Sequence, residues 1–506
     1  MVDTQLATTG SATPEELKRL VNSVIWPGFN GRTLPDWLRT ALQEGLAGVV
    51  YFRQNVDPDD PQQLSALSAE IRAANPRAII GVDEEGGSVS RLEAKNGSSL
   101  PGAAVLGQLN DLALTEAAGR HLGQLCLDAG INLNLAPVAD VNTNPANPVI
   151  GIRSFGSDTD LVSRHSSAML RGIQSLGVGA CAKHFPGHGD TVTDSHLALP
   201  RLEMSFEELS SQHLPPMRAT VESGVRAVMT AHIVVPGLGD EEAETPATLN
   251  PAAGELLRSF GFDGLQITDA LDMAAIKATV GSGRGAVLAM LAGADLLCLG
   301  NPANPGSRSD KQEYQEVFQS LLLALAEGEL PIELFYRAQR RISEFLDWSE
   351  GQQAKRPTVE QSASGLIDWP SRVSTALRSN RDQTPRLLAG EVQFCDLRGG
   401  HNLATGKLGN FFSAALSEFR PVRLRSLEEL KALKQPNAEQ AVVVLVDSLI
   451  AGGSQLSLLN ELAAELPELV CINAGLAPSE DPVPTTLSCF DSSRVTARAV
   501  AQLLVG

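Results

Sequence analysis

The amino-acid sequence predicts an α/β protein with two parts: an N-terminal (β/α)8 barrel and a smaller α/β domain with a mostly parallel sheet. Short apolar runs alternate with helix-like segments over roughly the first two thirds of the 506 residues, as expected for consecutive βαβ units. A polar stretch then interrupts the pattern, and a shorter series of apolar runs follows it. In the longer part, titratable residues stand directly after several runs, where a barrel places its active site.

Eight apolar runs predict the strands of the barrel. They are residues 24–27, 47–52, 78–82, 132–136, 179–183, 227–230, 265–268 and 296–299. Segments with helical periodicity lie between them, at residues 62–74, 112–129, 161–176, 206–222 and 283–292. An earlier helix begins at Pro14, because Thr13 is a good N-cap residue and proline suits the first helical position. Eight units in this order are the pattern of a (β/α)8 barrel with inserted loops.

The sequence divides into four parts. Residues 1–12 predict a flexible polar leader, residues 13–348 the barrel, residues 349–364 a linker, and residues 365–506 a C-terminal α/β domain. The linker is polar and lacks apolar periodicity. The C-terminal domain contains strand-like runs at residues 391–397, 422–424, 441–446 and 469–472, with helical segments at 427–434 and 455–466. This spacing predicts an open, mostly parallel sheet without an evident catalytic residue, and we expect His401 to be a surface histidine.

Composition is ordinary for a soluble globular protein with a large core. The formal net charge is −19, which disfavours nucleic acid and anionic membrane surfaces as partners. No apolar run is long enough to span a membrane, and the N-terminus lacks the pattern of a signal peptide. The six cysteines are far apart and lack C-x-x-C spacing, which predicts reduced, buried thiols. These features predict a cytoplasmic protein.

The loop at residues 183–196, KHFPGHGDTVTDSH, is the most informative segment. It follows the apolar residues 178–182 and combines histidines, aspartates and a lysine with glycine and proline. Such a loop at the carboxyl end of a strand predicts a catalytic site. Its side chains could also hold a metal ion, but Lys183 is a poor neighbour for a cation, so we expect none.

A second candidate is Asp269, which follows an apolar run within the segment ITDALDM. Aspartate is also a good N-cap residue, so the alternative role of Asp269 is to cap a helix that begins near Leu271. Asp83, Asp140 and His232 also stand at or just after the ends of apolar runs. Because these ends meet at one rim of a barrel, we expect the polar side chains to cluster there.

Together these motifs resemble glycoside hydrolase family 3, in particular its bacterial β-N-acetylglucosaminidase branch. That branch has a KHFPGHG…DSH loop and a [ST]-D-x-L-x-M segment, which this chain matches at residues 183–196 and 268–273. Further matches follow in order: DEEGGSVSR (83–91), GINLNLAPVADVN (130–142), NPVIGIRSFG (147–156), MTAHI (229–233), PATL (246–249) and GADLLCLG (293–300). The resemblance covers roughly residues 15–345.

The resemblance implies a retaining exo-β-N-acetylglucosaminidase that releases terminal GlcNAc through a covalent glycosyl-enzyme intermediate. It makes Asp269 the nucleophile, and it makes His196 with Asp194 the acid-base dyad. In an extended segment, positions i and i+2 lie on the same side, so Asp194 can fix the tautomer of His196 and raise its basicity. Asp272 is the alternative nucleophile, and His188 is the alternative acid.

The resemblance also implies a sugar-binding set: Asp83, Arg91, Arg153, Lys183 and His184. Asp83 accepts hydrogen bonds from sugar hydroxyls, and the other four complete the −1 subsite. Glu84 and Glu85 could be mistaken for the carboxylate pair of a glycosidase, but Asp83 occupies the position that the family uses. Family members often have arginine where this chain has Ser88, which we expect to loosen one loop contact.

Two alternative functions remain open, on the same fold. A phosphorylase of β-N-acetylglucosaminides or β-glucosides is one, because a neutral histidine does not repel an anionic nucleophile such as phosphate. A non-catalytic sugar-binding protein is the other, although it would be expected to lack Asp269 or the Asp194/His196 pair, and both are present. We expect peptidoglycan-derived or related glycosides as substrates, and no cofactor.

Overall fold

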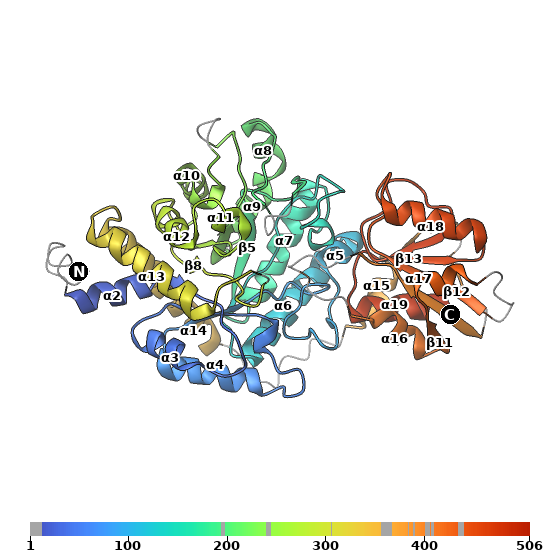
Figure 1. The fold of residues 1–506 in the computed structure, drawn as a ribbon, viewed down its shortest axis with the longest axis horizontal. Coiled ribbons are helices and arrows are strands. Elements are labelled where there is room, and N and C mark those ends of the chain that lie inside the picture. Colours follow the sequence, from blue (N-terminus) through green and yellow to red (C-terminus); the bar gives the residue numbers. More distant parts are fainter. Residues whose placement is uncertain are drawn as a thin grey trace. The chain divides into compact units, whose positions relative to one another are not determined.

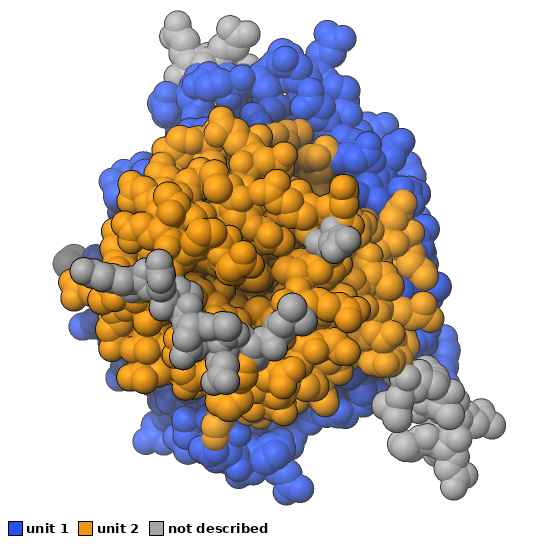
Figure 2. Space-filling view, turned by 90° about the vertical axis from the view of Figure 1, so that its right-hand side faces the viewer, with its two compact units in different colours: residues 1–84, 112–141, 158–358 blue, residues 85–111, 142–157, 359–506 orange. Residues whose placement is uncertain are grey.

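The computed structural model describes residues 13–193, 198–238, 244–304, 306–355, 367–382, 384–387, 390–399, 405, 409–433 and 440–506. The chain divides into two compact units, which Figure 2 colours separately. Unit 1 contains residues 1–84, 112–141 and 158–358, and unit 2 contains residues 85–111, 142–157 and 359–506. Each unit therefore combines segments that are far apart in the sequence.

Unit 1 is built on short parallel strands that close into a barrel, with helices packed around them (Figure 1). The strands are β1 (Ile25–Trp26), β2 (Gly48–Tyr51), β3 (Ile79–Val82), β4 (Leu133–Asn134), β5 (Gly179–Phe185), β6 (Ala227–Thr230), β7 (Leu265–Thr268) and β8 (Leu297–Cys298). Strands β2 to β7 pair in chain order, and β1 pairs with β8. Parallel bridges from Gly28 to Val50 and from Ile267 to Leu296 join these two sheets into a ring. The predicted (β/α)8 barrel is confirmed.

The helices of unit 1 lie before, between and after the barrel strands. They are α2 (Pro14–Asn22), α3 (Asp36–Gln43), α4 (Gln63–Ala74), α6 (Leu112–Asp128), α7 (Thr159–Gln174), α8 (Phe206–Gln212), α9 (Leu214–Glu222), α10 (Pro251–Ser259), α11 (Ala274–Lys277), α12 (Ser282–Leu291), α13 (Asp310–Ala326) and α14 (Ile332–Ala354), with 3-10 turns η2 (Arg53–Asn55) and η4 (Ala247–Leu249). Thr13 and Glu16 form a capping box at α2, as the predicted cap requires. Helices α6 and α7 approach closely at Gly119, which has no side chain. A Cβ there would lie 2.2 Å from the Met169 carbonyl oxygen. Within the described residues, no helix combines the length and the apolar character needed to cross a membrane.

The amino-terminal rim of the barrel carries a buried ion-pair cluster around Asp295, which precedes β8. Asp295 is fully buried, and its carboxylate lies 2.8 Å from Arg258 Nη2 and 3.0 Å from Arg341 Nη1. Arg337 Nε lies 3.5 Å away, and the backbone N–H of Gln266 donates to the same carboxylate. This end of a barrel usually serves stability, and a buried carboxylate with three cationic neighbours fits that role.

Unit 2 is built around a six-stranded sheet with the order β11-β10-β12-β13-β14-β9, which has helices on both sides (Figure 1). The strands are β9 (Arg378–Ser379), β10 (Glu391–Asp396), β11 (Val422–Leu424), β12 (Gln440–Val446), β13 (Val470–Asn473) and β14 (Thr485–Ser488). The helices are α5 (Ala103–Leu109), α15 (Trp369–Ser374), α16 (Phe411–Ser417), α17 (Leu427–Lys431), α18 (Ser454–Glu465) and α19 (Arg494–Val505), with the 3-10 turn η3 (Gly151–Arg153). All strand pairs are parallel except β14 with β9. The predicted, mostly parallel α/β domain is confirmed.

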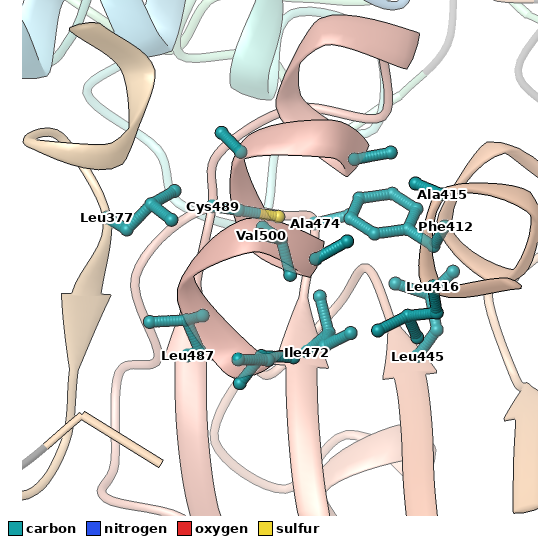
Figure 3. Packing of buried hydrophobic residues seen from close by; sticks show 14 of the residues in the cluster. Leu377, Phe412, Ala415, Leu416, Leu445, Ile472, Ala474, Leu487, Cys489 and Val500 are labelled. Atoms are coloured by element: carbon teal, nitrogen blue, oxygen red, sulfur yellow. The ribbon is translucent and has the colours of Figure 1, made fainter. Parts of the chain in front are cut away.

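Two apolar layers cover the faces of the unit 2 sheet. On one face, Leu445, Ile472 and Leu487 pack against side chains from α16 and α19 (Figure 3). On the other face, alternate strand residues such as Val444 and Cys471 pack against α17 and α18. This alternation follows from the two-residue period of a strand and makes unit 2 a three-layer sandwich.

The segment 85–111 is part of unit 2 because it shares that unit's core and its hydrogen bonds. Ala104 and Val105 of α5 belong to the apolar layer on the α19 side of the sheet. Ser88 Oγ donates to Asp491 Oδ1 at 2.9 Å, and Gly102 N–H donates to Asp491 Oδ2 at 3.3 Å. Asp491 is buried, so these bonds tie the segment to the start of α19.

The structure corrects three predictions about elements and boundaries. The helix predicted at residues 206–222 is two helices, α8 and α9, because Pro215 lacks the N–H that would continue α8. The predicted linker begins inside α14, which continues to Ala354. Segments 85–111 and 142–157, predicted as part of a continuous barrel domain, belong to unit 2. The predicted leader, residues 356–366 and His401 lie outside the described residues.

Candidate active site

Polar side chains gather at the carboxyl ends of the barrel strands. Asp83 directly follows β3, and Asp140 lies in the loop after β4. Lys183 and His184 are among the last residues of β5, and Asp269 directly follows β7. Parallel strands of a barrel end on the same rim, so residues from four strands share this end of unit 1.

Lys183 and Asp83 form an ion pair at this rim. Lys183 Nζ lies 2.7 Å from Asp83 Oδ1, and the lysine side chain is 2% exposed while the aspartate side chain is 20% exposed. The pairing of β5 with β6 shifts register between Lys183 and Phe185. A buried ammonium group is tolerated here because the carboxylate compensates its charge. The pair gives the site a carboxylate of fixed orientation, which suits hydrogen bonds from hydroxyl groups.

Asp140 holds His184 and the turn that leads to His188. Its buried carboxylate lies 2.7 Å from His184 Nδ1, and it accepts the backbone N–H groups of His184 at 3.2 Å and His188 at 2.7 Å. Burial alone would raise the pKa of Asp140, but the two histidines and these hydrogen bonds outweigh it and lower that pKa. Asp140 therefore stays ionised and requires a proton on Nδ1 of His184. The sequence placed Asp140 at the rim without revealing this role.

His188 is a neutral, structural residue. Its side chain is 1% exposed, and Nδ1 lies 2.8 Å from Thr191 Oγ1. Burial and, next, the neighbouring His184 together lower the pKa of His188 to about 4. A histidine that is neutral near pH 7 lacks the extra proton that a general acid must donate. The structure therefore disfavours His188 as the alternative acid.

Asp269 lies at the end of β7 in a constrained backbone. Its N–H donates to the Thr230 carbonyl oxygen at 3.0 Å, and its Oδ1 accepts the Ala270 N–H at 2.7 Å. The next helix, α11, begins at Ala274 and has Met273 at its N-cap position. Asp269 therefore does not cap that helix, and its half-buried side chain stands directly after β7 at the rim.

The competing carboxylate, Asp272, serves the structure of the loop after β8. A Cβ at Gly300 would lie 1.7 Å from Asp272 Oδ1, so the aspartate packs directly against that glycine. Asp272 Oδ2 also accepts a hydrogen bond from Ser307 Oγ at 3.2 Å. These contacts give Asp272 a packing role and favour Asp269 as the reactive group.

Arg153 and Arg91, both predicted to bind sugar, belong to unit 2. Arg153 lies in η3 and forms a two-point ion pair with Glu85, with Nη2 2.8 Å from Oε1 and Nε 3.0 Å from Oε2. Its Nη1 donates to the Val149 carbonyl oxygen at 3.1 Å. Arg153 also lines a cavity of about 360 Å³, all of whose lining residues belong to unit 2. Glu85 thus orients Arg153, a role that sequence reasoning missed because 68 residues separate the two.

Arg91 and Glu84 differ in how far they are buried. Arg91 is half-buried in the loop that follows β3. Glu84 is fully buried, and its backbone N–H and carbonyl group bond to the Asn134 side chain at 3.1 Å and 2.9 Å. Glu84 therefore joins β3 to β4 and is no candidate for the glycosidase pair.

The predicted dyad, Asp194 and His196, lies outside the described residues, and its role stays a prediction. Across the described part of the chain, no three His, Cys, Asp or Glu side chains are grouped so that they could hold a metal ion. All six cysteines are buried thiols that form no disulfide.

The fold and the site define the class of protein: a (β/α)8-barrel enzyme whose carboxylates and imidazoles stand at the carboxyl ends of the strands. The model of the glycosyl hydrolase family 3 N-terminal domain matches residues 28–345 of the chain. The chain belongs to glycosyl hydrolase family 3.

Several relatives are similar over much of the chain. A β-hexosaminidase A from Pseudoalteromonas piscicida is 31% identical over 336 residues, which are 62% of this chain and 55% of that protein. The chain thus spans about half the length of this relative. A β-hexosaminidase from Stenotrophomonas maltophilia is 35% identical over 53% of this chain and 79% of its own length. The structure of a family 3 β-N-acetylglucosaminidase from Paenibacillus is similar with a TM-score of 0.82 and 30% identity, covering 97% of this chain and 96% of that chain.

Proposed function

We propose that the protein is a retaining exo-β-N-acetylglucosaminidase that releases terminal GlcNAc from peptidoglycan-derived or related glycosides. The observation that carries the proposal is the rim of the barrel: Asp269 stands there with the Lys183–Asp83 and His184–Asp140 pairs. The names of the similar β-hexosaminidases and of the Paenibacillus β-N-acetylglucosaminidase support the choice of sugar.

In the proposed reaction, Asp269 attacks the anomeric carbon and displaces the leaving-group oxygen, which gives a covalent glycosyl-aspartate. His196, oriented by Asp194, protonates that oxygen and later takes a proton from the attacking water. This dyad is carried over from the family resemblance alone. Net retention follows because two displacements occur at the same carbon.

Sugar binding is assigned to Asp83, Lys183 and His184 in unit 1, and to Arg91 and Arg153 in unit 2. The ion pair between Lys183 and Asp83 supports this assignment, because paired charges keep their orientation while they accept and donate hydrogen bonds. No cofactor is part of the proposal. We also infer a cytoplasmic enzyme without nucleic-acid partners, which the free cysteines and the net charge of −19 support.

The test is a turnover assay with aryl β-GlcNAc and aryl β-glucoside, each with and without inorganic phosphate. We expect release of free GlcNAc from the first substrate, at a rate that phosphate leaves unchanged. Formation of a sugar 1-phosphate would instead establish the phosphorylase alternative, and binding without turnover would establish the sugar-binding one. Asp269→Ala should retain less than about 1% of the wild-type rate, because covalent catalysis contributes several kcal/mol to barrier lowering.

A further inference from the structure

His232 lies just after β6, on the side of Asp269, and both of its ring nitrogens have partners. The side chain is fully buried. Nε2 lies 2.9 Å from the Ala270 carbonyl oxygen, and Nδ1 lies 3.0 Å from Thr248 Oγ1. Ala270 is the residue that directly follows the candidate nucleophile.

The direction of the first hydrogen bond is fixed by chemistry. A carbonyl oxygen can only accept, so Nε2 of His232 carries a proton and donates it to Ala270. Thr248 Oγ1 lies 3.0 Å from Nδ1 and 3.0 Å from the Thr230 carbonyl oxygen. Its single hydroxyl proton serves one of these two acceptors at a time, and the contact with Nδ1 keeps the ring in this orientation.

These bonds clamp the backbone on both sides of Asp269. On the amino-terminal side, Asp269 N–H donates to the Thr230 carbonyl oxygen at 3.0 Å. On the carboxyl-terminal side, the Ala270 carbonyl group is held by His232, and the Leu271 N–H donates to the Cys298 carbonyl oxygen at 2.9 Å. The peptide between them carries the Ala270 N–H that bonds to Asp269 Oδ1 at 2.7 Å. The Ala270 N–H and carbonyl group belong to adjacent peptide units, so the donor that orients the carboxylate lies next to a carbonyl group whose direction His232 fixes.

We propose that His232 is a positioning residue for the nucleophile: its Nε2–H fixes the Ala270 carbonyl group and thereby the direction of the Asp269 carboxylate. This inference rests on the proposed role of Asp269. An error of about 1 Å in the placement of a reacting group can cost on the order of 100-fold in rate. His232 touches no reacting atom in this scheme, so its loss affects the chemical step and leaves ground-state binding of the sugar in place.

Two substitutions distinguish the contact made by Nε2 of His232 from the contact made by Nδ1. The amide nitrogen of glutamine reaches about as far as Nε2 of histidine, whereas that of asparagine reaches only as far as Nδ1. His232→Gln keeps the donor to Ala270, and His232→Asn keeps the contact with Thr248 but removes that donor. Thr248→Val is a third variant, which removes the hydroxyl that orients the ring and leaves the Ala270 contact possible.

The experiment measures kcat and KM on aryl β-GlcNAc, the inhibition constant of free GlcNAc, and the melting temperature, for the full chain. We expect His232→Gln to keep kcat within about 5-fold, His232→Asn to lower it about 30- to 100-fold, and Thr248→Val to lower it about 3- to 10-fold. KM and the inhibition constant should change by less than about 3-fold in each. Equal loss in the Gln and Asn variants, or a loss that falls on KM, would overturn the positioning role.

Asp269→Ala, measured in parallel, separates this inference from the proposed function. If Asp269→Ala retains substantial activity, the assignment of the nucleophile fails. If Asp269→Ala is inactive while His232→Asn and Thr248→Val turn over at the wild-type rate, only the positioning role of His232 fails. If the Asn variant does not fold, Thr248→Val and His232→Gln still decide the question through their kcat values.

Discussion

Replacement of Asp140 by asparagine tests the polar support of the rim most directly. The carboxylate is fully buried, and it accepts hydrogen bonds from His184 Nδ1 at 2.7 Å, from His184 N–H at 3.2 Å and from His188 N–H at 2.7 Å. Asparagine has the same shape but one acceptor oxygen in place of two, and no charge. The remaining oxygen can keep the two backbone N–H groups. The new NH2 group then faces His184 Nδ1, where a donor already stands.

The cost follows from the bonds that are lost. A hydrogen bond to a charged group contributes about 1.5–3 kcal/mol, so the loss of the charged bond to His184 should lower the free energy of unfolding by about 2–3 kcal/mol. Asp140→Ala leaves all three donors without an acceptor and should cost about 3–5 kcal/mol. In Asp140→Asn, a neutral His184 must move its proton to Nε2, and we expect kcat/KM on aryl β-GlcNAc to fall at least about 10-fold.

The assay is urea unfolding at pH 7 together with steady-state kinetics. Asp128→Asn is the matched control, because Asp128 is exposed at the end of α6, and it should change stability by less than about 0.5 kcal/mol. The lowered pKa of Asp140 means that its contribution is present above the ordinary pKa of a carboxyl group and is lost as the pH falls through the folded-state pKa. The difference between wild type and Asp140→Asn should shrink accordingly below about pH 4. Equal unfolding free energies at pH 7 and unchanged kinetics would refute this account of Asp140.

Because the pKa of His188 is lowered from its ordinary value to about 4, the unfolded chain binds the extra proton first. Stability should therefore fall by up to about 3 kcal/mol between pH 6.5 and 4, and His188→Gln should flatten this slope in unfolding measured across that range. Asp295→Asn should lower the free energy of unfolding by about 3–5 kcal/mol. Its kcat should stay near wild type, since Asp295 lies at the amino-terminal ends of the strands, away from the candidate site. A stability loss below about 1 kcal/mol in urea titrations would count against a stabilising role of the ion-pair cluster. A chain that ends at Ala354 lacks Asp491, the partner of Ser88, and should be poorly soluble. Any soluble fraction should still turn over aryl β-GlcNAc, because the proposed catalytic groups all precede residue 270. A folded form that binds GlcNAc without cleaving it would show that unit 2 supplies a catalytic group.

The barrel was predictable because each of its strands is marked locally. Runs such as residues 79–82 and 265–268 are apolar and short, and a polar residue follows each of them. The break at His213 also has a local cause, because Pro215 and Pro216 follow it and cannot donate the backbone hydrogen bonds that would continue α8. Strands β9 and β14 were missed because they are short and their sequences, RS and TTLS, carry little apolar signal.

The site was predictable in its residue types and much less in its pairings. The sequence marked Lys183, His184 and Asp269 through the loops that carry them. It did not reveal that Asp140 holds His184 or that Glu85 holds Arg153, because each pair joins loops that only the closed fold brings together. The periodicity of apolar residues describes a single helix or strand. These contacts depend instead on the order of strands around the barrel and on which early segments belong to unit 2.

The discontinuous make-up of unit 2 has a consequence for how the chain is made. Segments 85–111 and 142–157 leave the ribosome early, but their packing partners in α19 follow only after several hundred further residues. At about 5–20 residues per second, the apolar side chains of α5 wait on the order of tens of seconds for their core. Unit 2 also cannot be exchanged between relatives as one continuous stretch of coding sequence. A functional chimera would have to carry the two early loops together with the C-terminal segment that they pack against.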